Sequence, residues 1–330
     1  MSKGIQEERT QAGSVSIIRK GINQVVQLPD GYHIETKLAK LTPRERLLYH
    51  LRQGALDLHM HSTASDGLDS PPEILSKVMD RRLRCFSITD QDTLWGVQDC
   101  QIILDKLRQM RMKLPDFIPG VELTVDDEGQ EIHILAYFPN GGEQQLRPLL
   151  LKNKASRDLR NRLLCERLTA LGMPVTFEEL NRQGGQVINR HHAAVLLLRK
   201  GYCNSIAEAF ERWLDKGQPA HITYDHPSAS ETLEAISQAG GLSILAHPYE
   251  YEHLADAAVL RERLTELRNL GLDGVEVVHS TSGPREWAKL AQLARELDLI
   301  RTCGSEYCGL NKRGVQIFQA EQDFRPYLLD

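Results

Sequence analysis

Apolar and polar side chains alternate along residues 56–61, which read L-D-L-H-M-H. Side chains two positions apart share one face of a strand, so this pattern predicts a strand with one apolar face. The other face carries the carboxylate of Asp57 and the imidazoles of His59 and His61. Asp66 follows in a Ser-Asp-Gly turn that can bring its side chain back over the strand end. Two histidines on one strand face can bind the same metal ion; the alternative is a half-exposed strand with surface histidines.

The remaining pattern alternates short apolar runs with amphipathic stretches. Runs typical of strands lie at 85–90, 117–125, 131–138, 243–248, 274–280 and 299–307. Helical periodicity or capping signals mark 43–53, a helix that begins after Ser70, 94–112, a helix that begins after Ser228, 259–270 and 284–298. Repeated strand–helix units predict an α/β protein with a mainly parallel sheet, either open or closed into a barrel.

The pattern also divides the chain. Residues 1–54 form an N-terminal extension with a capping helix, and 55–141 and 228–330 carry the strand–helix units. Residues 142–227 become helical and basic, so we expect an insert there. A leucine stripe in the insert predicts one amphipathic helix ending at Gly172 (Leu159, Leu163, Leu164, Leu168 and Leu171). In the extension, S-V-S-I-I-R and N-Q-V-V-Q-L predict a hairpin around Lys20-Gly21; whether the extension covers the body or dimerises is open.

Composition excludes several classes of protein. With 330 residues and 41% hydrophobic content, the chain can build a core, and no apolar run reaches the roughly 20 residues of a membrane span. The N-terminus has no apolar signal region, and the six cysteines are scattered (85, 100, 165, 203, 303 and 308). We therefore expect reduced thiols and a cytoplasmic location, with no membrane partner.

Charge is unevenly distributed along the chain. The net charge of −5 gives no overall attraction to nucleic acid or an anionic membrane. Residues 151–200, however, contain ten Lys or Arg against four Asp or Glu. This basic segment either faces an anionic substrate or is a solvated helix surface.

Potential metal ligands recur at the carboxyl ends of the predicted strands: His59, His61, Asp90, Glu122, His133, His247 and Glu306. Parallel α/β folds build their sites at this edge, because the loops converge there. A mixed set of imidazoles and carboxylates suits Zn²⁺, Mn²⁺ or Fe²⁺ better than Ca²⁺ or Mg²⁺.

Seven separated motifs occur in an order that resembles the PHP (polymerase and histidinol phosphatase) superfamily: D-L-H-M-H-S-T-A-S-D-G, S-I-T-D-Q-D-T, P-G-V-E-L-T, E-I-H-I-L-A-Y-F, A-G-G-L-S-I-L-A-H-P, G-L-D-G-V-E-V and C-G-S-E-Y-C-G. The insert, with N-R-H-H-A-A, resembles the branch of bacterial nucleotide phosphatases and 5′–3′ exoribonucleases. The resemblance spans about residues 55–315 and implies a distorted (β/α)₇ barrel with metal ions at the strand ends.

The resemblance implies ligands for three ions. The first would take His59, His61, Glu122 and residue 306; the second would share Glu122 and add His133 and His247; the third would take Asp66 and residues 91 and 308. This chain departs from the family at three of these positions. It has Gln91 where the family has His, Glu306 where it has Asp, and Cys308 where it has His. We therefore expect two divalent ions, with a third that is weak or absent, although a Cys308 thiolate suits Zn²⁺.

The resemblance assigns Arg190 and His192 in the insert to the substrate phosphate, although Arg190 is equally compatible with a helix surface. His279 ends a strand near the site, where it is either a supporting or a structural residue. The implied function is hydrolysis of a phosphate monoester by a metal-bridging hydroxide, on a small nucleotide (a nucleoside mono- or 3′,5′-bisphosphate) or an RNA 5′ end. Few aromatics interrupt the basic insert, which favours a mononucleotide over a stacked RNA. The alternative is a catalytically impaired protein that binds metal or nucleotide as a regulatory module, because of Gln91, Glu306 and Cys308. The oligomeric state is open.

Overall fold

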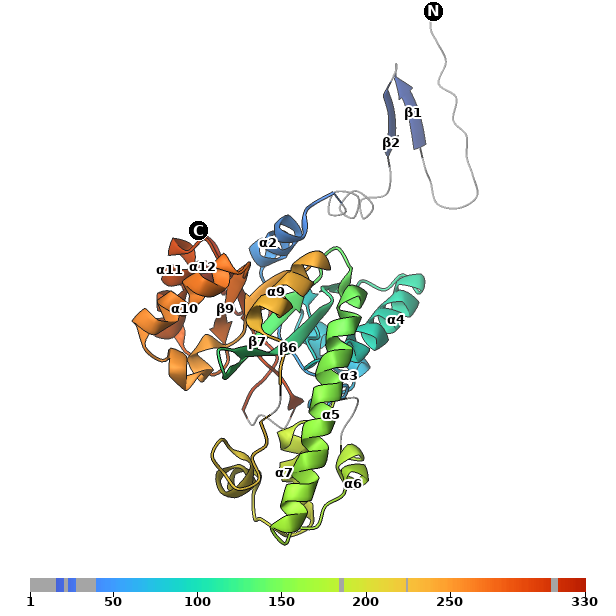
Figure 1. Ribbon diagram of the computed structural model, residues 1–330. Coiled ribbons are helices and arrows are strands. Elements are labelled where there is room, and N and C mark those ends of the chain that lie inside the picture. The colour runs from blue at the N-terminus through green and yellow to red at the C-terminus, as the bar shows by residue number, and fades with distance from the viewer. Residues whose placement is uncertain (1–15, 21–22, 28–39, 184–186, 224, 310–313) are drawn as a thin grey trace, which may run out of the picture.

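The computed structural model describes residues 16–20, 23–27, 40–183, 187–223, 225–309 and 314–330 (Figure 1). The strands form a five-stranded sheet of order β10-β9-β8-β7-β6, a three-stranded sheet of order β3-β4-β5 and a separate β1-β2 pair. Their bounds are β1 Ser16–Lys20, β2 Asn23–Gln27, β3 Leu56–Asp57, β4 Cys85–Phe86, β5 Asp116–Phe117, β6 Gly120–Asp127, β7 Gln130–Tyr137, β8 Leu242–Leu245, β9 Gly274–His279 and β10 Ile300–Gly304. The hairpin predicted around Lys20-Gly21 is present as the antiparallel pair β1-β2.

The five-stranded sheet is mixed, whereas the three-stranded sheet is parallel throughout. Strands β3, β4 and β5 are parallel, as are β8, β9 and β10. Strand β7, however, is antiparallel to both β6 and β8. The cause is local: only Glu128 and Gly129 separate β6 from β7, both at positive φ, so the chain turns back in a tight hairpin. Isolated parallel bridges, Met60 to Tyr307 and Gln91 to Glu122, bring the two larger sheets together.

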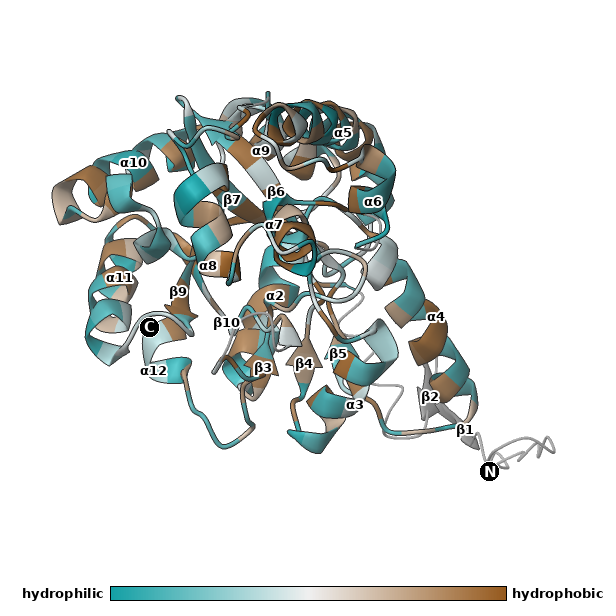
Figure 2. Cartoon of the chain, turned by 90° about the horizontal axis from the view of Figure 1, so that it is seen from below, coloured by the Kyte–Doolittle hydropathy of each residue, from teal (hydrophilic) through white to brown (hydrophobic). Residues whose placement is uncertain are grey.

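Helices lie outside the strands (Figure 2). They are α2 Pro43–Gln53, α3 Pro71–Asp80, α4 Trp95–Gln109, α9 Ala229–Gln238, α10 Ala257–Asn269, α11 Pro284–Glu296 and α12 Arg325–Leu328, with short turns η3 Pro248–Glu250 and η4 Glu252–Leu254. The first begins as its sequence predicts: Thr42 and Glu45 form a reciprocal capping box, with Pro43 at the first helical position. Among the described residues, no helix is long and apolar enough to cross a bilayer. All six cysteines are buried thiols, and none of them forms a disulfide in the described part of the chain.

The basic insert packs around its own apolar core. Its elements are η1 Glu143–Leu146, α5 Arg147–Ala170, α6 Phe177–Asn181, α7 Arg190–Arg199, α8 Ile206–Ala209 and η2 Phe210–Leu214. In Figure 1 the long helix α5 runs from the body down beside α6 and α7. The core extends from Leu164 to Ala220 and is separate from the two clusters of the body.

The predicted leucine stripe is wrong for most of its members. Leu164 and Leu168 are buried, whereas Leu159, Leu163 and Leu171 are exposed. The packed face of α5 continues instead through polar residues that a count of leucines misses: Asn153, Arg157, Arg160 and Asn161, all buried. Asn153 and Arg157 contact Asp92 of the body, and Asn161 donates to the carbonyl of Ile188.

Candidate metal centre

Four imidazoles converge on the carboxylate of Glu122. Its Oε1 lies 3.0 Å from His133 Nδ1, 3.1 Å from His247 Nε2 and 3.4 Å from His59 Nε2. Its Oε2 lies 3.4 Å from His61 Nε2. Glu122 is only 2% exposed, and His59 is completely buried. The alternative of surface histidines on a half-exposed strand is therefore wrong.

Neighbouring strands hold these side chains in place. The regular part of β3 ends at Asp57, and the chain continues extended beside β10, where Leu58 N–H donates to the carbonyl of Cys303 at 3.2 Å. Gly304 permits this close approach, since a Cβ there would lie 2.1 Å from His59 Cβ. Glu122 and His133 come from opposite strands of the β6-β7 hairpin, and His247 follows β8. The site thus joins segments that are distant in the sequence.

The charges in this cluster are strongly coupled. Burial alone would raise the pKa of Glu122, but the imidazoles of His133 and His59 hold it well below its usual range. Burial would lower the pKa of His133, yet Glu122 and Glu131 outweigh it and raise this pKa to about 9. In the same way, Glu276 and Glu122 overcome burial and raise the pKa of His59 well above normal. Without an ion, His59 and His133 therefore stay protonated to a higher pH than a free imidazole does.

The donor atoms fit divalent metal ions. His59 Nε2 lies 3.1 Å from His61 Nε2, and His133 Nδ1 lies 3.4 Å from His247 Nε2. Ligand atoms around one tetrahedral ion with bonds of ~2.0–2.1 Å are about 3.4 Å apart. Two groups of facing donor atoms share Glu122: one contains His59 and His61, and the other contains His133 and His247. Imidazole and carboxylate together suit borderline divalent ions.

The other predicted ligands do not form a third compact group with Asp66. The turn does bring Asp66 back, 3.1 Å from His61 Nδ1, and His61 helps lower the pKa of Asp66 to about 2 against the effect of burial. Cys308 lies instead with His61 and Glu306. Asp66 belongs to none of the candidate metal groups found in the part of the chain that the structure describes. Gln91 faces Asn189, with its Oε1 3.4 Å from Asn189 Nδ2.

Asp90, another expected ligand, has a supporting position. Its carboxylate accepts hydrogen bonds of 2.7 Å from Ser62 N, Ser62 Oγ and Ser65 Oγ. It therefore shapes the loop that carries Asp66. Among the described residues, it is in none of the candidate metal groups.

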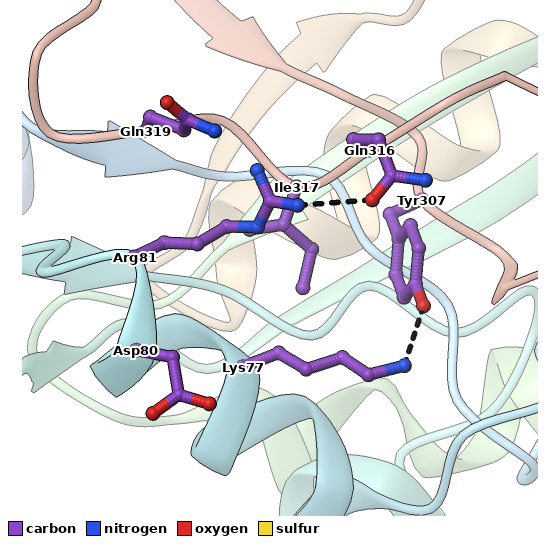
Figure 3. A pocket seen from close by; sticks show the side chains of 7 residues that line it. All are labelled: Lys77, Asp80, Arg81, Tyr307, Gln316, Ile317 and Gln319. Atoms are coloured by element: carbon purple, nitrogen blue, oxygen red, sulfur yellow. Dashed lines mark hydrogen bonds between the residues drawn. The ribbon is translucent and has the colours of Figure 1, made fainter.

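Tyr307 lies between Glu306 and Cys308, the last two of the predicted ligands. Its hydroxyl donates to Asp69 at 2.6 Å and accepts from Lys77 at 2.7 Å, at the edge of a 390 Å³ surface pocket (Figure 3). Glu306 and Cys308, on either side of Tyr307, lie with His61 at the site instead. In the same pocket, Arg81 Nη2 donates to Gln316 Oε1 at 2.9 Å (Figure 3).

Arg190 and His192 lie in the first turn of α7, beside the site. Arg190 Nη2 donates to Glu131 Oε1 at 3.2 Å, and His226 Nε2 lies 3.4 Å from Glu131 Oε2. Burial lowers the pKa of His192 to about 4, and the charges of His191 and Arg157 add to this effect. His192 is therefore neutral near pH 7 in the substrate-free protein. It can still donate one ring N–H.

Sequence reasoning missed several supporting residues. Glu276 on β9 is fully enclosed; its Oε1 lies 3.1 Å from His59 Nδ1, and its Oε2 accepts from His247 N–H at 3.0 Å. Glu276 lies in G-L-D-G-V-E-V, one of the seven motifs of the resemblance. That motif was the signal by which the sequence could have pointed to Glu276. His279 Nε2 lies 2.8 Å from Glu306 Oε2. This contact fits the first of the two roles considered for His279, that of a supporting residue. Supporting partners of this kind orient metal ligands in proteins.

A second missed feature joins the insert to the body. The buried Arg157 of α5 forms an ion pair with Asp92, which also accepts hydrogen bonds from Asn153 Nδ2 at 2.9 Å and Thr124 N–H at 3.0 Å. Asp92 has φ 51, and His247 and Glu306 also have positive φ values of 28 and 53. Strained backbone of this kind persists only where surrounding contacts enforce it, and it concentrates at functional sites.

Comparison with known proteins agrees with this geometry. The chain is 29% identical over 252 residues to a 5′–3′ exoribonuclease of Salmonella typhimurium, covering 76% of this chain and 84% of the relative. It is 28% identical to a 5′–3′ exoribonuclease of Haemophilus influenzae, covering 79% and 93% of the two chains. It is 25% identical to a 3′,5′-nucleoside bisphosphate phosphatase of Chromobacterium violaceum, covering 81% and 91%. These relatives support the resemblance of the chain to the PHP superfamily.

Solved structures show the same fold as this chain. An amidohydrolase from Chromobacterium violaceum superposes with a TM-score of 0.70 at 23% identity, covering 82% of this chain and 93% of the other. A Bifidobacterium adolescentis protein assigned to the metal-dependent phosphoesterases gives 0.69 at 25% identity, covering 83% and 96%. No family model matches the chain.

Proposed function

We propose that this protein is a metal-dependent phosphoesterase that hydrolyses a phosphate monoester of a small nucleotide or an RNA 5′ end. The observation that carries the proposal is the convergence of four imidazoles on the buried carboxylate of Glu122. The named activities of the relatives, an exoribonuclease and a bisphosphate phosphatase, support the substrate class.

The donor set fits two divalent ions, and Glu122 would be a ligand of both. His59, His61 and Glu306 would hold one, and His133 and His247 would hold the other. Mn²⁺, Zn²⁺ and Fe²⁺ suit these ligands. When bound, such a pair supplies an activated water and stabilises charge on the phosphoryl oxygens. Glu276 would keep the His59 ring in place, since its carboxylate can accept a hydrogen bond from Nδ1–H and leave Nε2 available as a ligand.

Residues of the insert would bind the substrate phosphate. Arg190 can exchange its contact with Glu131 for two phosphate oxygens, because a guanidinium presents parallel N–H donors. His192, neutral in this site, would add a single N–H bond. A 480 Å³ cavity beside them, lined by Ser65, Asp66, His191 and His192 among others, offers room for the rest of the nucleotide.

Two wider features belong to the same proposal. The parallel bridges that join the two larger sheets, at Met60–Tyr307 and Gln91–Glu122, favour the distorted (β/α)₇ barrel of the family. Six buried thiols without disulfides in the described residues favour a reducing compartment such as the cytoplasm.

The test is phosphate release by chelator-stripped protein that is re-supplied with Mn²⁺ or Zn²⁺. The substrates are nucleoside monophosphates, 3′,5′-bisphosphates and short 5′-phosphorylated RNA. We expect metal-dependent turnover that is lost in His59→Ala and kept in His221→Ala, a histidine that contacts the carbonyl of Leu214 in the insert. Mononucleotide products from RNA would identify an exoribonuclease; phosphate from bisphosphates alone would identify a phosphatase. Tight Mn²⁺ binding without turnover on any substrate would instead support a regulatory binding module.

A further inference from the structure

The side chain of Asn189, which precedes α7, lies between two positions that the PHP resemblance assigns to a third ion. Its Nδ2 is 3.2 Å from Asp66 Oδ2 and 3.4 Å from Gln91 Oε1. A primary amide has two N–H groups, so it can serve both acceptors. The insert thereby reaches the metal side of the body through one neutral side chain.

The hydrogen-bond pattern fixes the orientation of both amides. The backbone N–H of His192 donates to Asn189 Oδ1 at 3.3 Å, as in a helix N-cap, so the NH₂ group must face Asp66 and Gln91. Thr124 Oγ1 donates its proton to Asp92 at 2.9 Å and can only accept from Gln91 Nε2, at 3.3 Å. Gln91 must then present its oxygen to Asn189. No exchange of amide oxygen and nitrogen satisfies these partners equally well.

This arrangement does not suit a cation. A bound ion would lie about 2.0–2.6 Å from Asp66 Oδ2 and from Gln91 Oε1, because carboxylate and carbonyl ligands bind at such distances. Here they accept hydrogen bonds from an N–H donor instead. Cys308, at the remaining third-ion position, also has other partners. Its Sγ contacts the carbonyl oxygen of Glu306 at 3.3 Å, and it groups with His61 rather than with Asp66.

We propose that the Asn189 amide takes the place of a third metal ion, bridging Asp66 and Gln91 and positioning α7 over a two-ion centre. This proposal rests on the proposed phosphoesterase function and deepens it. Asn189 is a positioning residue: it fixes the helix turn that carries Arg190 and His192 relative to Asp66. This neutral bridge joins the phosphate-binding turn of the insert to the metal side of the body.

The experiment counts ions in full-length protein. Chelator-stripped wild type is equilibrated with Mn²⁺ over a range of concentrations, and bound metal is measured by mass spectrometry and calorimetry. Asn189→Asp keeps the N-cap oxygen but replaces the two N–H donors with a carboxylate oxygen beside Asp66. We expect two ions per wild-type chain and three per Asn189→Asp chain. Asn189→Ser keeps an N-cap oxygen, but its side chain is too short to bridge Asp66 and Gln91. For this variant we expect two ions per chain and a KM raised about fivefold, with kcat nearly unchanged.

Two results would overturn the proposal: three tightly bound ions in the wild type, or two in a folded Asn189→Asp variant. If that variant does not fold, Gln91→His combined with Asn189→Ser provides the second route to a third ion, and a count of two there overturns the proposal equally. Failure of the proposed function is a separate outcome, in which wild type holds its two ions but releases no phosphate from any substrate.

Discussion

The site has two sides that are built differently. On the body side, His59, His61 and Glu122 are almost fully buried and are fixed by strands and by further carboxylates such as Glu276. On the insert side, Asn189 and Arg190 come from the first turn of one helix, and Arg190 is about one-third exposed. Buried charges hold ions, whereas half-exposed donors can exchange partners when a substrate arrives. The difference suggests that chemistry is assigned to the body and recognition to the insert.

The largest expected effect on activity is on the body side, at Glu122. Glu122→Gln keeps the shape but removes the charge that faces four imidazoles, so both ions should be lost. We expect phosphate release to fall by roughly 10³-fold or more, because metal ions supply several kcal/mol of transition-state stabilisation. Metal content and turnover would be measured together. A variant that keeps two ions and normal turnover would show that Glu122 is not the shared ligand.

The next effect tests support on the body side. Glu276→Gln removes the carboxylate beside His59 Nδ1 and should weaken Mn²⁺ affinity about 10–100-fold, as loss of such partners does elsewhere. Calorimetric titration with Mn²⁺ checks it. Glu296→Gln is the matched control, because Glu296 is a solvent-exposed residue of α11 that pairs with Arg261. Equal affinity in both variants would contradict the role given to Glu276.

The third prediction concerns the metal-free protein. With a pKa of about 9, His133 is charged in the folded state over a range where an unfolded histidine, with a pKa near 6.5, is neutral. Its contribution to stability is therefore complete below about pH 6.5 and is lost as the pH rises through about 9. The Tm of the metal-free protein should fall over this window, and less steeply in His133→Asn. Mn²⁺ affinity should rise over the same window, since ions need neutral imidazoles. A wild-type Tm that does not change from pH 6.5 to 9 would contradict the stabilisation that we attribute to protonated His133.

The smallest effect concerns the insert side. Glu131 pairs with Arg190 and repels an anionic substrate, so Glu131→Gln should lower KM roughly three- to tenfold at low salt, with less change at high salt. Steady-state kinetics at two ionic strengths would measure this. Glu128→Gln is the control, because the exposed Glu128 lies in the same hairpin but pairs with Arg263. Equal KM changes in the two variants would mean that long-range charge, and not the Arg190 contact, sets substrate affinity.

The order of elements and the set of candidate ligands could be predicted from the sequence, because both depend on local patterns. The alternation around His59 and His61 and the capping signal before residues 43–53 each involve residues a few positions apart. The leucine stripe of α5 failed because burial there depends on what the helix faces. Arg157 pairs with Asp92 of the body and Asn161 donates to the carbonyl of Ile188 within the insert, whereas Leu159 lies in solvent.

By itself, the sequence determined that histidines and carboxylates end successive strands, and that Gln91, Glu306 and Cys308 stand where the PHP family has other ligands. Only the tertiary structure decided their partners: Glu122 between four imidazoles, Cys308 beside His61, and Asn189 between Asp66 and Gln91. The physical reason is that hydrogen bonds and ion binding depend on distances of a few ångströms between atoms. Such distances, between residues as far apart in the chain as Asp66 and Asn189, are set by how strands and insert pack and not by local sequence.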